Sequence, residues 1–183
     1  MRRALDIAEA AFGPQHPTVA TRLNNLATLL KATNRLAEAE PLMRRALAIA
    51  EASFGPQHPD VAIDLNSLAL LLKDTNRLAE AEPLLRRALD IDEAAFGPQH
   101  PTVARHLNNL AHLLQATNRL AEAEPLMRRH FEIFVKFTRD TGHPHPHLVA
   151  ATENYRILLI KMGDSQAQAQ EKIEQILEPI CPR

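Results

Sequence analysis

The fold is decided by residues 16–57, HPTVATRLNNLATLLKATNRLAEAEPLMRRALAIAEASFGPQ. A near copy of this stretch begins at His58 and another at His100, so the chain repeats itself every 42 residues. A fixed period of this length is typical of repeat proteins, in which each unit is one small motif and the units stack on their neighbours.

Two helices are predicted in each unit. Helix A begins at Pro17, where the missing N–H would have had no partner, and carries an apolar stripe at three- and four-residue spacing: Val19, Leu23, Leu26, Ala27 and Leu30. Helix B extends from Arg35 to Ser53, and the side chains predicted to face inward are Leu36, Ala39, Met43, Ala46, Leu47 and Ala50.

Short polar or kinked motifs are expected to punctuate these helices. Thr33 and Asn34 offer an N-cap for helix B, and Gly55 suits a left-handed C-terminal turn. One proline also lies beyond the first turn of each helix B, where it removes a backbone hydrogen bond. A local bend is therefore predicted at Pro41, Pro83 and Pro125.

The repeat predicts an all-α fold, because a two-helix unit cannot bury its apolar stripe alone whereas stacked copies can. The chain is predicted to be a single array. It consists of a truncated helix B, three full units, and a degenerate fourth unit with a C-terminal cap, in that order: residues 1–15, 16–57, 58–99, 100–142 and 143–183.

The two ends of the array depart from the regular pattern. Met1–Leu5 matches Met43–Leu47, so the chain opens inside a helix B whose helix A is missing. We expect either a fragment of a longer array or a start within a repeat, and an exposed first helix on which a neighbour could stack.

After the third unit the pattern decays. Helix B is predicted to continue through Phe131–Phe137, and the fourth helix A to span His147–Met162. A polar helix over Ser165–Leu177, ended by Pro179 and Pro182, would shield the last core from water.

The apolar positions resemble the tetratricopeptide repeat, in the order Leu23-x-x-Leu26-Ala27-x-x-Leu30 and then Ala39-x-x-x-Met43-x-x-Ala46. The 42-residue length and the Leu-Asn-Asn-Leu-Ala and Arg-Arg-Ala-Leu-x-Ile runs are similar to the kinesin light chain repeats, and bacterial repeat proteins of this subclass are more similar still. The resemblance implies a right-handed α-α superhelix, a TPR solenoid of stacked helix-turn-helix repeats, and a bacterial source.

The same resemblance implies a peptide-binding surface, because helix A lines the concave face in this family and peptides lie along it. The second Asn of Leu-Asn-Asn is expected to contact the peptide backbone, and an amide can bind a peptide bond of either polarity. These positions are Asn25, Asn109 and Asn154, with Ser67 in the second unit. The other candidate peptide-binding residues lie on the same helices: Asn24, Thr28, Lys31, Asn66, Leu70, Lys73, Arg105, Asn108, His112 and Gln115.

An alternative role for the Asn residues is to bond neighbouring repeats and fix their stacking. The cations Lys31, Lys73 and Arg105 weakly favour a partner with acidic residues or a free carboxylate. Ser67 and Leu70 would weaken a polar clamp in the middle of the array.

No metal, cofactor or catalytic site is predicted. His16, His58 and His100 recur once per unit, and stacked repeats lie on the order of 10 Å apart, whereas zinc needs nitrogens at ~2.1 Å. We expect these histidines at helix starts. The run His143–His147 has no Cys, Asp or Glu beside it, and the chain shows no nucleophile–base pair and no Gly-rich phosphate loop.

Composition excludes several classes of partner. A formal net charge of -1 does not suit a duplex nucleic-acid binder, and no apolar run approaches the roughly 20 residues that span a bilayer. Cys181 is the only cysteine, so no internal disulfide is possible. A cytoplasmic location is expected, with neither nucleic acid nor membrane as a partner.

The leading functional hypothesis is a protein–protein interaction scaffold that binds an extended or helical peptide segment in its concave groove. The alternative is an architectural or self-associating arm of a larger signalling protein, a possible homo-oligomer that docks through the open N-terminal repeat edge. A designed array without a partner would fit the near-identical repeats, but the irregular Phe131–His147 stretch argues against it.

Overall fold

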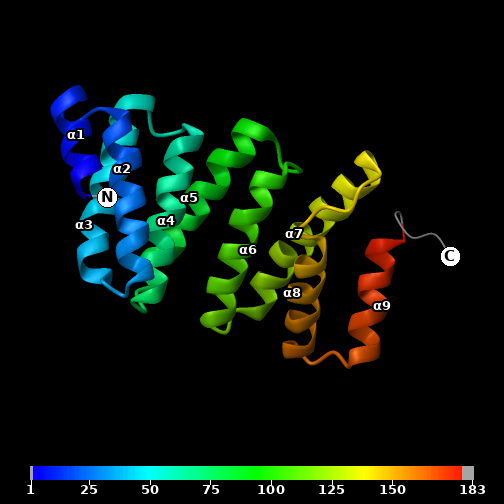
Figure 1. The fold of residues 1–183 in the computed structure, drawn as a ribbon. Helices are drawn as coiled ribbons and strands as arrows, with labels where there is room; N and C mark the ends of the chain where they lie inside the picture. The colour runs from blue at the N-terminus through cyan, green and yellow to red at the C-terminus, as the bar shows by residue number, and fades with distance from the viewer. Residues whose placement is uncertain (1, 179–183) are drawn as a thin grey trace. The chain divides into compact units, whose positions relative to one another are not determined.

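The computed structural model describes residues 2–178, and all regular structure in that range is helical. Pro179, Cys181 and Pro182 lie outside the described residues. The helices alternate between the predicted helix B and helix A (Figure 1): α1 (Arg2–Phe12), α2 (Pro17–Ala32), α3 (Leu36–Phe54), α4 (Pro59–Asp74), α5 (Leu78–Phe96), α6 (Pro101–Ala116), α7 (Leu120–Thr141), α8 (Leu148–Lys161) and α9 (Gln166–Leu177).

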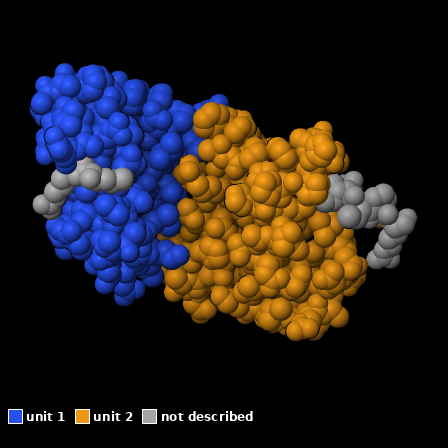
Figure 2. Space-filling model, in the orientation of Figure 1, with its two compact units in different colours: residues 1–95 blue, residues 96–183 orange. Residues whose placement is uncertain are grey.

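The chain forms two compact units, residues 1–95 and 96–183 (Figure 2). Unit 1 holds α1 to α4 and α5 up to Ala95, and unit 2 begins at the last residue of α5 and contains α6 to α9. The single continuous array predicted from the sequence therefore stays a prediction.

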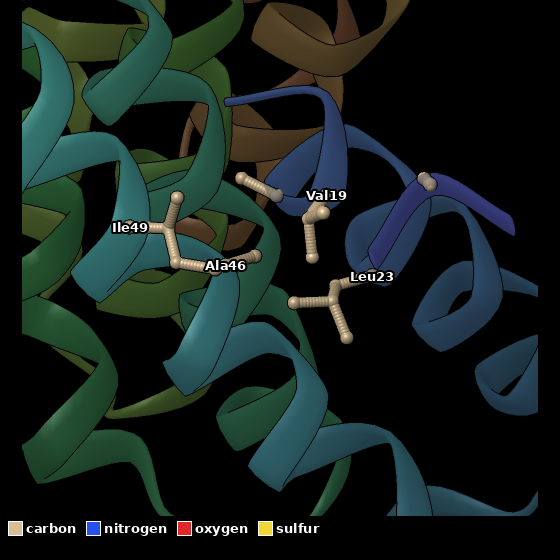
Figure 3. Close-up of a cluster of buried hydrophobic side chains, with 6 residues drawn as sticks. Val19, Leu23, Ala46 and Ile49 are labelled. Carbon is tan, nitrogen blue, oxygen red and sulfur yellow. The ribbon is translucent and has the colours of Figure 1, made fainter. Parts of the chain in front are cut away.

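In unit 1, one packing arrangement occurs twice. Val19, Ala20 and Leu23 of α2 pack between Ala8 of α1 and two residues of α3, Ala46 and Ile49 (Figure 3). The same cluster follows 42 residues later, where α4 packs between α3 and α5: Ala50, Val61, Ala62, Leu65, Ala88 and Ile91. Burying each Leu, Val or Ile stabilises the fold by about 1.5–3 kcal/mol. Within unit 1, each helix A thus packs between the preceding helix B and its own.

The core of unit 2 contains larger side chains. Phe131 of α7 is fully buried, and its ring lies 6.0 Å from the ring of Tyr155 on α8. As predicted, α7 is longer than the other B helices, with 22 residues against 19 in α3 and α5. On α9 the two fully buried residues are Ala169 and Ile173, while most of its other side chains are exposed.

The predicted helix-start histidines are confirmed. His16, His58 and His100 are the N-caps of α2, α4 and α6, and the Nδ1 atom of each accepts a hydrogen bond of 3.2 Å from the backbone N–H two residues later. Each ring also stacks on the last phenylalanine of the preceding helix, at a centroid distance of 4.8–5.0 Å. These histidines therefore satisfy a free N–H at the helix start and cover an exposed ring.

The predicted N-cap of helix B is wrong. Thr33 is instead the C-cap of α2, with its hydroxyl donating to the carbonyls of Leu29 and Leu30, each at 3.0 Å. Asn34 adopts the left-handed conformation, φ 58°, which Asn tolerates better than most residues. The N-cap of α3 is Arg35, which makes no capping bond through its side chain but pairs with Glu38. The tight turn needs a left-handed residue, and this shifts the start of helix B.

Three smaller expectations have mixed outcomes. Gly55 has the positive φ that was expected, 86°, but its ψ of 158° lies outside the left-handed helical region. Ile49 is a core residue that the inward-facing set omitted, whereas Leu36 and Leu47 are only partly buried. Pro41, Pro83 and Pro125 lie inside continuous helices, and the bend predicted there stays a prediction.

Candidate functional site

All fourteen candidate residues lie on the A helices. In unit 1 they are carried by α2 and α4, which are in contact, and in unit 2 by α6 and α8. The structure brings some of them together within each unit and uses others to join consecutive A helices.

In unit 1, two polar contacts link α2 to α4. The Asn24 amide Nδ2 donates to Asp64 Oδ1 at 2.6 Å, and Lys31 Nζ lies 3.0 Å from Asp74 Oδ2. Asn24 and Lys31 therefore have partners within the array. The alternative role of the Asn residues, fixing the stacking, fits Asn24.

Unit 2 has a similar pair of contacts between α6 and α8. Asn154 Nδ2 donates to Asn108 Oδ1 at 3.1 Å, and Lys161 Nζ donates to Gln115 Oε1 at 3.3 Å. Here two predicted site residues, Asn108 and Asn154, bond each other, which again fits the stacking role.

The remaining candidates differ in how accessible they are. Asn66 is 7% exposed, and Asn109 and His112 are partly buried and already interact with other residues. The hydroxyls of Thr28 and Ser67 donate to carbonyls of their own helices, Asn24 O and Ile63 O, each at 2.9 Å, and Leu70 is partly buried.

Three candidate side chains stay available for a partner. Asn25 is exposed and has no hydrogen-bond partner among residues 2–178. Lys73 and Arg105 likewise form no ion pair with any residue that the structure describes. These three have the polar capacity that binding a peptide would require.

A cleft of about 510 Å³ opens beside Asn24 and Asn25 in unit 1. We call it the α2–α4 cleft. Its walls are α2 and α4 and its floor is the end of α3, and the lining residues include Pro17, Thr18, Thr21, Arg22, Asn24, Asn25, Ala50, Phe54, Asp60, Ile63 and Asp64.

Asp64 is the unusual group of this cleft. It is only 8% exposed. Burial, helped by the neighbouring charge of Asp60, raises the pKa of the Asp64 carboxyl to about 7. A carboxylate withdrawn from water favours its protonated form, so Asp64 changes charge near neutral pH.

Unit 2 has a cleft of about 590 Å³ in the corresponding place, which we call the α6–α8 cleft. Its lining residues include Pro101, Thr102, Arg105, Asn108, His130, Phe134, His145, Pro146, His147, Ala150 and Asn154. Among the described residues that line it there is no carboxylate, and the one permanent charge is the guanidinium of Arg105.

The His143–His147 run supplies one wall of the α6–α8 cleft. The His145 ring stacks on Phe134 at 4.2 Å and meets Phe137 edge-on at 4.8 Å. The buried His130 ring lies edge-on to Phe134 at 5.0 Å, and its Nδ1 is 2.8 Å from the carbonyl of Ala104. Burial lowers the pKa of His130 to about 4 and also lowers the pKa of His145, so both rings are neutral at pH 7.

Sequence reasoning missed Asp64, Phe134 and His145 as site residues. A signal existed for the first two, because each breaks the repeat. Asp64 occupies the position that Arg22 and His106 occupy in the other 42-residue repeats. Phe134 occupies the position of Ala50 and Asp92. Within residues 2–178, no group of three or more His, Cys, Asp or Glu side chains could hold a metal ion, and no helix is long and apolar enough to cross a membrane.

Comparison with known proteins identifies the class. A family model described as tetratricopeptide repeat matches residues 1–52, 23–94 and 65–134. The overlapping matches extend over residues 1–134, well over half of the chain, so the chain belongs to the tetratricopeptide repeat family. No curated protein matches the chain.

Solved structures show the same fold. One is BtubC (BKLC) from P. vanneervenii, with 24% identity and a TM-score of 0.79, covering 96% of this chain and 69% of that one. Another is a Podosopora anserina protein described as a putative kinesin light chain with nearly identical TPR-like repeats, with 20% identity and a TM-score of 0.76, covering 100% of this chain and 86% of that one. A third, pilF of Pseudomonas aeruginosa, has 16% identity and a TM-score of 0.52, covering 95% and 72%.

These comparisons confirm the predicted tetratricopeptide fold and its likeness to kinesin light chain repeats. Because the identities are below 25%, the structures inform the fold alone. The expected bacterial source stays a prediction. Proteins of this family generally mediate protein–protein interactions, and their scaffold fold is typically not that of an enzyme.

Proposed function

We propose that the chain is a protein-interaction scaffold that binds a peptide segment of a partner, extended or helical, along its A helices. One observation carries the proposal. Asn25 presents an exposed amide, unused by the fold, at the edge of a cleft of about 510 Å³. A side-chain amide can both donate to and accept from a peptide backbone. We propose no catalytic activity, and a cytoplasmic location.

The charge that this chain prefers on its partner depends on which of its own cations have no ion-pair partner. Lys31 is neutralised by Asp74, whereas Arg105 has no carboxylate beside it in the α6–α8 cleft. An unpaired guanidinium at the mouth of a cleft favours a carboxylate ligand, which it can bind through two N–H groups. We therefore propose that acidic residues of the partner bind in unit 2.

The test begins with peptides selected on the intact chain from a random display library. Asn25→Ala should weaken their binding roughly tenfold, since one or two lost hydrogen bonds are worth about 1–3 kcal/mol. Gln57→Ala, an exposed amide in the loop before His58, is the matched control and should have no effect. Affinity is measured by fluorescence anisotropy and helicity by circular dichroism. The proposal fails if no peptide is selected, or if Asn25→Ala binds the peptides as tightly as Gln57→Ala does.

A second candidate function is favoured by a specific observation on α1. Ile7 is 60% exposed, whereas its counterparts Ile49, Ile91 and Ile133 are each 1% exposed. In unit 1, Ile49 packs against helix A of its own repeat, and among the described residues no helix A covers this face of α1. This bare face supports an architectural role, in which α1 docks on a second copy of the chain.

Sedimentation at micromolar concentration tests this second function. A dimer that Ile7→Asp disperses would support it, whereas a monomer, or a dimer that the variant leaves intact, would refute it. Ile7 suits this test because its side chain is 60% exposed, whereas the neighbouring apolar residue Leu5 packs partly against the core. Ile63→Asp serves as the control, since Ile63 is also exposed, at 43%, but lies on α4.

A further inference from the structure

The α2–α4 cleft contains a buried carboxylate without a counter-ion. Asp64 is more than nine-tenths buried, and within the described residues its hydrogen-bond partner is the neutral amide of Asn24. Among the described residues, no Lys, Arg or His forms an ion pair with it. A carboxylate withdrawn from water without a cation is unfavourable, and proteins normally pair such a group.

The repeat itself does not require an acid at this position. The residues equivalent to Asp64 in the neighbouring 42-residue repeats are Arg22 and His106. The A helices therefore stack with a guanidinium, a carboxyl or an imidazole side chain at this position. The carboxylate is therefore a property of this cleft and not of the repeat fold. A buried carboxylate without a counter-ion, placed in a cleft, is characteristic of functional sites.

The other groups of the cleft also suit a positive charge. Asp60, one turn before Asp64 on α4, adds a second carboxylate, and Asn24 Oδ1 is a buried acceptor without a hydrogen-bond partner in the described residues. On α3, Ala50 and Phe54 line the floor, and Phe54 is 41% exposed. One face of the Phe54 ring is stacked on His58, at a centroid distance of 4.8 Å, and the part of the ring that stays exposed can attract a cation.

One cation already borders the cleft. Arg22 lies on the opposite wall, on α2, where it is exposed and forms no ion pair with any described residue. It forms no ion pair with Asp60 or Asp64, so neither carboxylate is neutralised by a contact with Arg22. An acceptor site for one further positive group is left.

We propose that the α2–α4 cleft binds one basic side chain of the partner, a lysine ammonium or an arginine guanidinium, with Asp64 as its counter-ion. This inference rests on the proposed function, and it assigns to unit 1 a ligand of opposite charge to the one proposed for unit 2. The bound cation replaces the missing counter-ion of Asp64, while Asp60 attracts it and Phe54 contacts its stem or its face.

The consequence is a linkage between binding and protonation. The cation binds to the ionised form of Asp64, and burial holds the pKa of the free carboxyl at about 7. Binding should therefore release a proton below that pH. Affinity should rise about tenfold between pH 6 and pH 8 and level off above, because only the ionised fraction of Asp64 binds.

The experiment uses three acetylated and amidated pentapeptides, with Arg, Glu or Gln at the centre of four alanines. Each is titrated to about 10 mM into the full chain, a concentration at which Kd values up to about 10 mM are measurable. Binding is followed by NMR through the carboxyl carbon of Asp64 and the amides of α2 and α4. The Arg peptide should bind best, more tightly at pH 8 than at pH 6, and should lower the pKa of Asp64.

Asp64→Asn is the decisive variant, because it keeps the shape and can still bond Asn24. It should weaken the Arg peptide at least fivefold at pH 8 and remove the pH dependence. Asp90→Asn, an exposed acid on α5 outside the cleft, should do neither. If the Gln peptide binds as well as the Arg peptide, and Asp64→Asn has no effect, the inference is overturned while the proposed function stands. A stronger response of the Asp64, α2 and α4 signals to the Glu peptide than to the Arg peptide, or no response of these signals to the Arg peptide, also overturns it.

Discussion

The α2–α4 cleft and the α6–α8 cleft occupy the same place in their repeats, yet they have opposite chemistry. Aligning the His-Pro pairs sets Thr21 against Arg105, Asp60 against His147, and Ala50 against Phe134. Two carboxylates and an arginine line the first cleft, and an arginine and three histidines line the second. The backbone frame is shared, whereas a few side chains decide which ligand each cleft suits.

The difference shows how a repeat protein acquires specificity. In unit 1 the core cluster recurs every 42 residues, so the positions that face the core have little freedom. Substitutions at the cleft leave that core intact, because they lie between one helix A and the next. Specificity can therefore change at little cost in stability, except where the new group is buried, as at Asp64 and Phe134.

The largest expected difference between the clefts is structural. Phe134→Ala should lower the free energy of unfolding of unit 2 by about 3–5 kcal/mol, because the ring is 3% exposed and packs on His130 and His145. The exposed ring Phe54, at the floor of the other cleft, should cost only about 1–2 kcal/mol when it is truncated.

Urea denaturation of both variants measures this difference. Tyr155 is the only tyrosine and the chain has no tryptophan, so tyrosine fluorescence reports unit 2 alone. Circular dichroism reports all helices. If the two variants lose the same free energy of unfolding, the Phe134 ring does not stabilise the α6–α8 cleft more than Phe54 stabilises the α2–α4 cleft.

The second comparison is a pair of opposite pH profiles. The folded pKa of Asp64, about 7, lies above its unfolded value near 3.8, so the folded state binds the extra proton. Its contribution to stability is lost as the pH rises from 4 to 7, by on the order of 2–4 kcal/mol. The folded pKa of His130, about 4, lies below the unfolded 6.5, so stability is lost as the pH falls from 6.5 to 4, by about 2–3 kcal/mol.

Each of the two pH dependences of the free energy of unfolding should disappear with one substitution. Asp64→Asn should make the chain more stable than the natural sequence at pH 8 but not at pH 4. His130→Leu should remove the acid-side loss seen by Tyr155 fluorescence. If Asp64→Asn is less stable at pH 8, the carboxylate has a counter-ion within the chain after all, and the cleft would not need an external cation.

The sequence predicted most of the fold because its signals are local and repeated. The stripe of Val19, Leu23 and Leu30, its repeats, and the proline at the start of α2, α4 and α6 predicted these A helices within one or two residues. The turn between helices A and B was misassigned, since Thr33 and Asn34 suit either a C-cap or an N-cap. The choice depends on the left-handed φ of Asn34, which the one-dimensional pattern does not reveal.

The site was less predictable, because its properties depend on contacts between repeats. The Asn24–Asp64 bond joins residues 40 positions apart, and the Asn108–Asn154 bond joins residues 46 apart. Neither spacing equals the period of 42, so aligning equivalent positions did not pair them. The stack of His145 on Phe134 was hidden for a similar reason: the longer α7 moves the aromatic partner one turn back from the position of Phe54.

A smaller effect is expected when the charge of each cleft is reversed. Arg105→Glu should weaken the peptide with central Glu about tenfold, that is, by about 1.4 kcal/mol, since it replaces an unpaired cation by an anion. Arg22→Glu, the matched change in unit 1, should leave this peptide unaffected and strengthen the peptide with central Arg. The same NMR titration measures both, with the amides of α6 and α8 as probes for the peptide with central Glu and those of α2 and α4 for the peptide with central Arg. An equal loss from both variants would show that net charge, and not the individual cleft, sets the preference.

The smallest effect concerns the contacts that hold the walls of the two clefts together. Lys31 and Asp74 form a partly exposed ion pair, with side chains 28% and 44% exposed, so Lys31→Ala should cost no more than about 0.5 kcal/mol. Lys161 in unit 2 bonds the neutral Gln115, and Lys161→Ala should cost as little. The two differ in salt dependence, because only the Lys31 contact joins opposite charges and is screened. Urea denaturation at low and high salt measures this difference. The free energy of unfolding lost in Lys31→Ala should be smaller at high salt, whereas the loss in Lys161→Ala should stay the same. If neither loss responds to salt, the α2–α4 wall is held by its buried contacts, with Asn24 and Asp64 as the polar link.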